Sequence, residues 1–122
     1  MRKILAVCVI CAGLTGCSGG SAESMVENMP QECKEMVQVS QEFIDKLKNT
    51  AEIPQYYIRF EAHFLDDFLK KLAHEPEERQ ASLCIPHHGI KQGQLRELQN
   101  ERQALLERIE KQRSSGRFSD FE

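Results

Sequence analysis

Histidines and carboxylates are the side chains of this sequence best suited to binding a metal ion. His63 and Asp67 are one helical turn apart and His74 falls near the same side, a spacing that could form a weak zinc or copper site. That side is the polar one, and catalytic zinc usually has three convergent protein ligands, so we expect a solvated surface there. His87 and His88 are adjacent, which points them about 100° apart on a helix and prevents them from sharing one metal.

The sequence offers little for nucleophilic or phosphate chemistry. Ser40 lies in the middle of an apolar helical face, where a serine commonly bonds to its own backbone, and no Gly-x-Ser-x-Gly elbow occurs. No glycine-rich phosphate loop occurs either, and the paired acids Glu77 and Glu78 stand at an exposed helix start. These patterns predict a protein that is not an enzyme and that uses no cofactor or metal.

The overall charge argues against nucleic acid as a partner. The chain has 16 Lys and Arg against 19 Asp and Glu, a net charge of −3 at pH 7. Proteins that bind a phosphate backbone or an anionic membrane surface cluster their basic residues, and no such cluster occurs here. We therefore expect no nucleic-acid partner.

Apolar spacing predicts the helices that must position these side chains. The first covers residues 30–49, with Pro30 in its first turn, and the second covers residues 55–74 after Pro54. The second helix has an apolar arc over nearly half its circumference, so we expect it at the centre of a bundle. An aromatic stripe dominates that arc and consists of Tyr57, Phe60, Phe64, Phe68 and Leu72.

Two residues of the second helix carry specific predictions. Phe64 lies in the middle of the arc, so we expect it to be buried and to organise the bundle. Glu61 falls inside the same arc, where we expect an exposed position near a helix end, with pairing to an arginine as the alternative.

The second half of the chain predicts two further helices separated by a break. Pro76 begins a short helix that ends at Ile85. Pro86 disfavours helical geometry in the residue before it and Gly89 permits a reversed dihedral, so residues 85–89 predict a break. The last helix then covers residues 90–112.

The last helix carries a short heptad line that Arg102 interrupts. We expect the half beyond Arg102 to project from the bundle and to bind a partner protein by helix pairing through Leu105, Leu106 and Ile109. Ordinary core packing of the whole helix is the alternative. Residues 113–122, with Ser114, Ser115 and Gly116, predict a mobile tail.

The beginning of the chain combines basic residues, a short apolar run and a cysteine. Arg2 and Lys3 precede an uncharged run over residues 4–14, which is shorter than the about 20 residues of a spanning helix. Leu14-Thr15-Gly16-Cys17 follows and resembles the lipobox of bacterial lipoproteins. The resemblance implies a diacylglyceryl group on the Cys17 sulfur and cleavage just before it.

This resemblance also implies how the chain is divided and where it resides. Residues 1–16 would be the signal peptide and residues 17–28, rich in Gly, Ser and Glu, a lipidated flexible tether. Acyl chains on Cys17 would hold the protein on a membrane. Ser18 stands where inner-membrane retention signals usually carry Asp, which implies the outer membrane with the domain facing the periplasm; the inner membrane and the cell surface are alternatives.

The five cysteines separate by compartment on this interpretation. Cys8 and Cys11 leave with the signal peptide, Cys17 takes the lipid, and Cys33 and Cys84 remain. Export to an oxidising space favours a disulfide between the last two, worth about 4 kcal/mol in the chain-entropy model. Two buried free thiols are the alternative, and neither cysteine has a second ligand at metal spacing.

An early cysteine, an aromatic second helix and the run E-P-E-E-R-Q-x-x-x-C at residues 75–84 resemble small uncharacterised helical two-cysteine lipoproteins of Gram-negative bacteria. The likeness covers about residues 29–90 and implies a helical fold without an established activity. We therefore predict an all-α fold, a small three- to four-helix bundle with one disulfide, over residues 29–112.

The leading functional hypothesis is a membrane-anchored lipoprotein whose periplasmic domain binds another protein of the cell envelope. The alternatives are a periplasmic chaperone or small-ligand binder that uses a groove between the second and last helices, and an accessory to a cell-envelope enzyme. A lined apolar groove would favour the ligand binder, and a core without a pocket would favour the protein partner.

Overall fold

Three helices begin directly after a proline, as the sequence predicts. In the computed structural model, which describes residues 27–122, Pro30, Pro54 and Pro76 precede α3 (Gln31–Lys48), α4 (Gln55–Leu72) and α5 (Glu77–Asn100). A proline at a helix start loses no hydrogen bond, because the first N–H groups of a helix have no partner within it. Two elements follow, α6 (Arg102–Ser114) and the 3₁₀ turn η2 (Ser119–Phe121).

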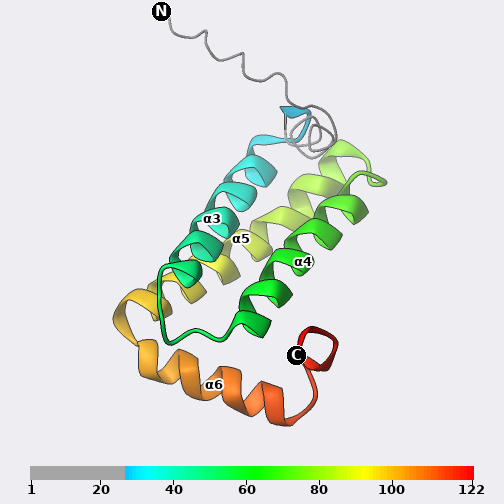
Figure 1. Cartoon of the computed structure of the whole chain (residues 1–122). Helices are drawn as coiled ribbons and strands as arrows, with labels where there is room; N and C mark the ends of the chain where they lie inside the picture. The colour runs from blue at the N-terminus through cyan, green and yellow to red at the C-terminus, as the bar shows by residue number, and fades with distance from the viewer. Residues whose placement is uncertain (1–26) are drawn as a thin grey trace, which may run out of the picture.

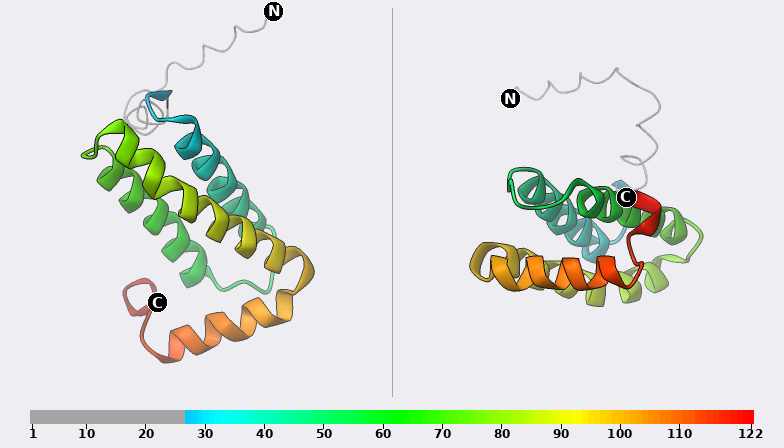
Figure 2. Two further views of the ribbon diagram at one scale, coloured as in Figure 1. Left: turned by 180° about the vertical axis from the view of Figure 1, so that it is seen from behind. Right: turned by 60° about the horizontal axis from the view of Figure 1, so that its bottom comes forward.

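The helices form an up-down-up bundle that is closed at one end by α6. Figure 1 shows α3 and α5 running in the same direction, with α4 running in the opposite one. Both views of Figure 2 show α6 crossing the end of the bundle, after which the chain returns to the first turns of α4. The predicted all-α bundle with four helices is confirmed, and the described residues contain no strand.

One hydrophobic core joins all the helices. α3 and α5 approach each other most closely, and α4 contributes its side chains from the third direction. The largest fully buried side chains come from every helix and from the C-terminal segment: Met36, Phe43, Leu47, Leu72, Leu98, Leu105, Ile109 and Phe118.

The predicted disulfide links α3 to α5. Cys33 and Cys84 are bonded, their Cα atoms lie 5.1 Å apart, and both are fully buried. The bridge closes a separation of 51 residues near the beginning of α3, so it ties together the two parallel helices at the end where the described chain starts. In addition, Gln80 donates a hydrogen bond of 2.7 Å to the carbonyl of Leu72 and so secures the end of α4.

The predicted break at residues 85–89 is wrong, because α5 continues through Pro86. A proline inside a helix removes one backbone hydrogen bond and costs about 3 kcal/mol. Here the same helix is bonded to α3 at Cys84 and packs along it, and this tertiary contact outweighs the local cost. The real interruption lies at Glu101, whose φ of −140° and ψ of 51° separate α5 from α6.

The bend at Glu101 turns α6 back over the bundle. Two ion pairs hold this bend: Arg108 lies 2.5 Å from Glu97 across it, and Arg102 lies 3.3 Å from Glu52 in the loop between α3 and α4. Leu105 of α6 faces the bundle and is completely buried.

Residues 113–122 pack against the bundle, which corrects the predicted mobile tail. Gly116 has a φ of +90°, and its N–H and that of Arg117 donate hydrogen bonds to the carbonyls of Arg113 and Gln112. This Schellman motif ends α6 and reverses the chain. Phe118 then inserts into the core with no exposed surface, against the rings of Tyr57 and Phe60.

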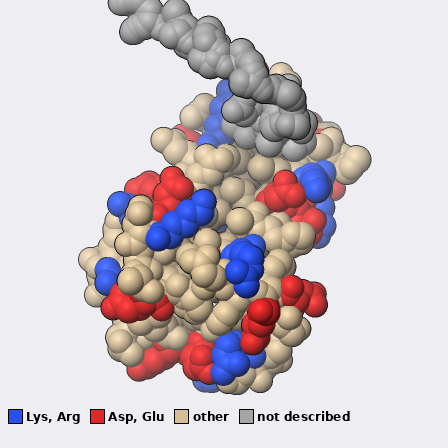
Figure 3. All heavy atoms as spheres, in the orientation of Figure 1, with Lys and Arg blue, Asp and Glu red and all other residues tan. Residues whose placement is uncertain are grey.

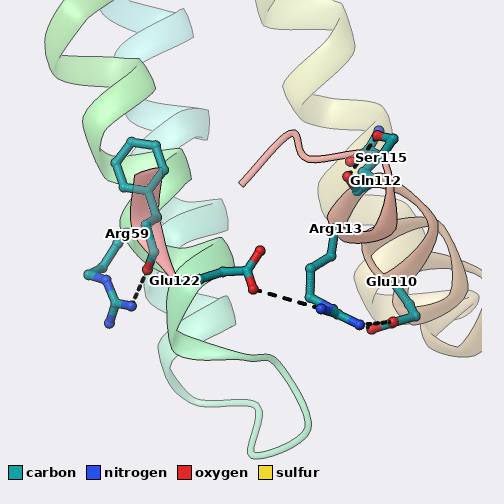
Figure 4. A network of polar contacts seen from close by, with 7 residues as sticks. Arg59, Glu110, Gln112, Arg113, Ser115 and Glu122 are labelled. Atoms are coloured by element: carbon teal, nitrogen blue, oxygen red, sulfur yellow. Dashed lines mark hydrogen bonds and ion pairs between the residues drawn. The ribbon is translucent and has the colours of Figure 1, made fainter. Parts of the chain in front are cut away.

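Polar contacts secure the end of this segment, as Figure 4 shows. Arg59 of α4 donates a hydrogen bond to the carbonyl of Phe121, and Arg113 of α6 lies 3.7 Å from Glu122 and 2.6 Å from Glu110. These contacts join α4, α6 and the end of the chain.

Replacing Phe118 tests whether the C-terminal segment is part of the core. Phe118→Ala is expected to cost about 3 to 5 kcal/mol of unfolding free energy, the usual loss for a buried phenylalanine. Phe64→Ala is the matched control, because that ring is 37% exposed, and we expect less than about half that loss. Urea unfolding followed by circular dichroism measures both, and equal losses would contradict this placement of Phe118.

Candidate functional site

A groove between α4 and α5 is the candidate site. It has a volume of about 200 Å³, and Arg117 of the C-terminal segment reaches its edge. We call it the α4/α5 groove. Its apolar lining consists of Phe60, Phe64 and Ile90, and its polar lining of Glu61, His87, Lys91, Gln94 and Arg117.

The aromatic stripe of α4 explains why a groove exists at this place. Rings one helical turn apart stack along α4, with centroids 6.2 Å apart for Phe60 and Phe64 and 6.4 Å apart for Phe64 and Phe68. The backbone of α5 lies farther from α4 than from α3, and these large side chains occupy the space between α4 and α5. The prediction that Phe64 is buried is wrong, because the ring stands at the mouth of the groove.

A buried ion pair forms the floor of the groove. Lys91 Nζ of α5 lies 2.5 Å from Glu61 Oε1 of α4, with side-chain exposures of 6% and 4%. The ammonium group also lies 5.3 Å from the centroid of Phe64 and 5.7 Å from that of Phe43, within cation–π range. Burial raises the pKa of Tyr57, and the charge of Glu61 and a hydrogen bond with it raise this pKa further, so the phenol stays protonated beside the pair.

The predicted exposed position of Glu61 is therefore wrong. The alternative of a paired carboxylate describes it better, although the partner is a lysine rather than an arginine. Removing two charges from water costs several kcal/mol, and a short contact in a site with aromatic walls offsets much of that cost.

His87 forms one end of the groove. Its ring stacks on Phe68 at 4.5 Å and lies 5.2 Å from Phe64. Burial, aided by the charge of Lys91, lowers the pKa of His87 to about 4, so the imidazole is neutral at pH 7. Its Nε2 atom is buried and has no hydrogen-bond partner in the described part of the chain, and the same holds for Oε1 of Gln94.

Among residues 27–122, Arg117 is the charged group of the groove that has no ion-pair partner. Its guanidinium carbon lies 5.2 Å from the centroid of Phe60, and no carboxylate of residues 27–122 forms an ion pair with it. The nearby acids of α6 and the C-terminus, Glu110 and Glu122, pair with Arg113 instead (Figure 4). On the face drawn in Figure 3, basic and acidic side chains alternate without a continuous patch of either sign.

Of the residues considered for metal or nucleophilic chemistry, His87 lines the groove, whereas the other histidines, Asp67 and Ser40 do not. His63, Asp67 and His74 are exposed, and residues 27–122 contain no group of three side chains arranged to hold a metal ion. Ser40 is buried beneath α3, where its hydroxyl lies 3.6 Å from the sulfur of Met36 rather than bonding to its own backbone. Within the described part of the chain, no serine, threonine or cysteine lines the groove.

The helix face expected to bind a partner protein packs against the core of the bundle. Leu105 and Ile109 are 0% and 2% exposed and Leu106 is partly buried, because α6 folds back over the bundle instead of projecting. The expectation of an exposed helix-pairing surface is therefore wrong. Cys17, the predicted lipidation site, and the signal peptide lie outside the described residues.

The sequence does contain a signal for the groove. Cys84, Lys91 and Leu98 follow one another at seven-residue intervals, and His87 and Gln94 take the position three residues after the first two. This is the heptad spacing of a helix face that packs on neighbours. Interpreted across Pro86, it places His87, Lys91 and Gln94 in the interior, where polar side chains mark a site.

No known protein family, curated protein or solved structure matches the chain. Among the helices of residues 27–122, none is both long enough and apolar enough to cross a membrane.

Breaking the buried ion pair from one side should be costly. Lys91→Met leaves Glu61 buried without its cation, and we expect a loss of about 3 to 5 kcal/mol of unfolding free energy. The double variant Glu61→Leu with Lys91→Met removes both charges and should recover most of that loss. Lys70→Met, which removes an exposed pair with Asp66, is the control and should change stability by less than about 1 kcal/mol. A Lys91→Met loss no larger than the control would contradict the burial of this pair.

The neutral His87 makes stability depend on pH. Its pKa is about 4 in the folded protein against 6.5 as the ordinary value, so the unfolded chain binds the additional proton as the pH falls between these values. Unfolding is therefore favoured by protonation, and stability decreases from pH 6.5 down to about 4, with no effect above that range. His87→Gln should weaken this decrease, while the exposed control His63→Gln should retain it. Urea midpoints from pH 7.5 to 4 measure the effect, and unchanged slopes in His87→Gln would count against it.

Proposed function

We propose that the protein is a membrane-anchored lipoprotein whose helical domain binds a small ligand in the α4/α5 groove. The residues Leu14-Thr15-Gly16-Cys17 and the short apolar run before them support the lipid anchor. Ser18 after the cysteine supports the outer membrane, with the domain on the periplasmic side. The disulfide between Cys33 and Cys84 fits an oxidising compartment.

The groove is the observation that carries the binding function. A dry apolar cavity of about 150 Å³ holds a benzene molecule, so about 200 Å³ between Phe60, Phe64 and Ile90 is enough for one ring and a short substituent. A ligand site needs apolar contact area together with polar groups that fix the orientation of the ligand, and the groove contains both. His87 and Gln94 supply such groups.

The exposed apolar residues favour a small ligand over a flat protein interface. Ile85 and Ile90 are 58% and 56% exposed. Five residues of helix separate them by about 140° around α5, so they do not join into one patch. Only Ile90 borders the groove, next to Phe64. Binding of another protein of the cell envelope stays a prediction, without the α6 surface that was expected to mediate it.

The groove is tested with toluene, a neutral single-ring probe, titrated into the purified full-length protein. We expect NMR shifts of the Ile90 methyl and the Phe64 ring that saturate with one site. Ile90→Arg should abolish them by filling the mouth of the groove with a charged side chain. Ile85→Arg makes the same change on the other flank of α5 and should leave binding intact. Saturating shifts that ignore both substitutions would place the site elsewhere and refute the groove.

The lipid anchor is tested separately at Cys17. Cys17→Ser removes the sulfur that would be acylated, so we expect unprocessed precursor and no incorporation of a labelled fatty-acid analogue in growing bacteria. Cys11→Ser, within the apolar run, is the control and should leave labelling at the wild-type level. A Cys17→Ser variant labelled as strongly as the wild type would rule out the anchor.

A further inference from the structure

The α4/α5 groove has a local charge imbalance that points to the chemistry of its ligand. Glu61 and Lys91 neutralise each other in its floor. His87 adds no charge at neutral pH, since burial holds its pKa near 4. Arg117 therefore gives the groove one positive charge, and its guanidinium group has no carboxylate partner in residues 27–122.

The backbone of Arg117, an exposed residue, is fixed by its two neighbours in the sequence. On one side Gly116, with its φ of +90°, forms the turn that ends α6. On the other side Phe118 is fully buried and fixes the backbone to the core. The guanidinium group then lies over Phe60, and its planar fork of N–H donors matches the geometry of a carboxylate.

The walls and the size restrict the rest of the ligand. Phe60, Phe64 and the imidazole of His87 line the groove, and aromatic lining of this kind favours a ligand with an aromatic ring. The volume of about 200 Å³ accepts one ring with a short side group. The Gln94 side chain, which carries both a carbonyl and an NH₂ group, can bond to a polar substituent.

We propose that the α4/α5 groove binds a single-ring aromatic carboxylate, with the ring against Phe60, Phe64 and Ile90 and the carboxylate on Arg117. This inference rests on the proposed function and names the ligand class of the same site. Phenylacetate has the required ring, the short link and the anion. Phenylacetamide has the same shape without the charge.

Titration of the full-length protein with these two probes at pH 7, followed by NMR, tests the charge requirement. We expect phenylacetate to bind about fivefold more tightly than phenylacetamide, the range of a partly exposed ion pair. Arg117→Gln should bring the dissociation constants of the acid and the amide to the same value, and Arg117→Lys should retain part of the preference. Arg96→Gln, an equal change of charge at an exposed position outside the groove, should leave the preference unchanged.

The outcomes separate this inference from the function on which it rests. Shifts at Ile90 with equal dissociation constants for the acid and the amide would overturn the carboxylate class and leave groove binding in place. A preference for the acid that survives in Arg117→Gln would overturn the role of Arg117. Absence of shifts at Ile90 and Phe64 with both probes and with toluene would overturn the groove itself.

Discussion

The contact between Lys91 and Glu61 constrains how α5, which packs along α3, can be placed against α4. A buried ammonium group has few acceptable neighbours, so α5 must be placed against α4 with this carboxylate at 2.5 Å. That register puts His87 against Phe68 and Phe64, and it puts Gln94 farther along the same face. The charge of Lys91 also helps to keep His87 neutral. The floor and one end of the groove therefore depend on a single interaction.

The helix starts are predicted correctly from the sequence because they depend on residues that are close together in the chain. The prolines before α3, α4 and α5 mark their first turns, and the compartment argument gave the pairing of Cys33 with Cys84. The break at 85–89 failed because a proline's preference is worth about 3 kcal/mol, while a long helix bonded and packed along α3 gains more from continuing. No residue type near Glu101 indicates that the helix bends there. The bend depends on contacts with distant residues such as Glu52.

The candidate site was harder to predict from the sequence. The spacing of apolar residues shows which face of a helix is buried, but it does not show which other helix packs against that face. The arc of α4 has two parts: Ile58, Glu61, Leu65 and Leu69 are buried, whereas the ring of Phe64 is on the flank. Close packing of α5 against this flank of α4 would bury Phe64. The groove between the two helices leaves the ring exposed instead. Lysine side chains are usually exposed to solvent, so the residue type alone does not indicate that Lys91 is buried. Its burial follows from Glu61, which lies 30 positions earlier in the chain.

The C-terminal segment connects the stability of the domain to the proposed binding. It contributes Arg117 to the groove and Phe118 to the core, so both depend on the same reversal at Gly116. A ligand that contacts Arg117 binds the state in which this segment is docked, and by mass action it must stabilise that state. The disulfide cannot replace this contact, because it joins α3 and α5 near the opposite end of the bundle. On the proposed function, the docking of residues 115–122 and the affinity of the groove are therefore two aspects of one equilibrium.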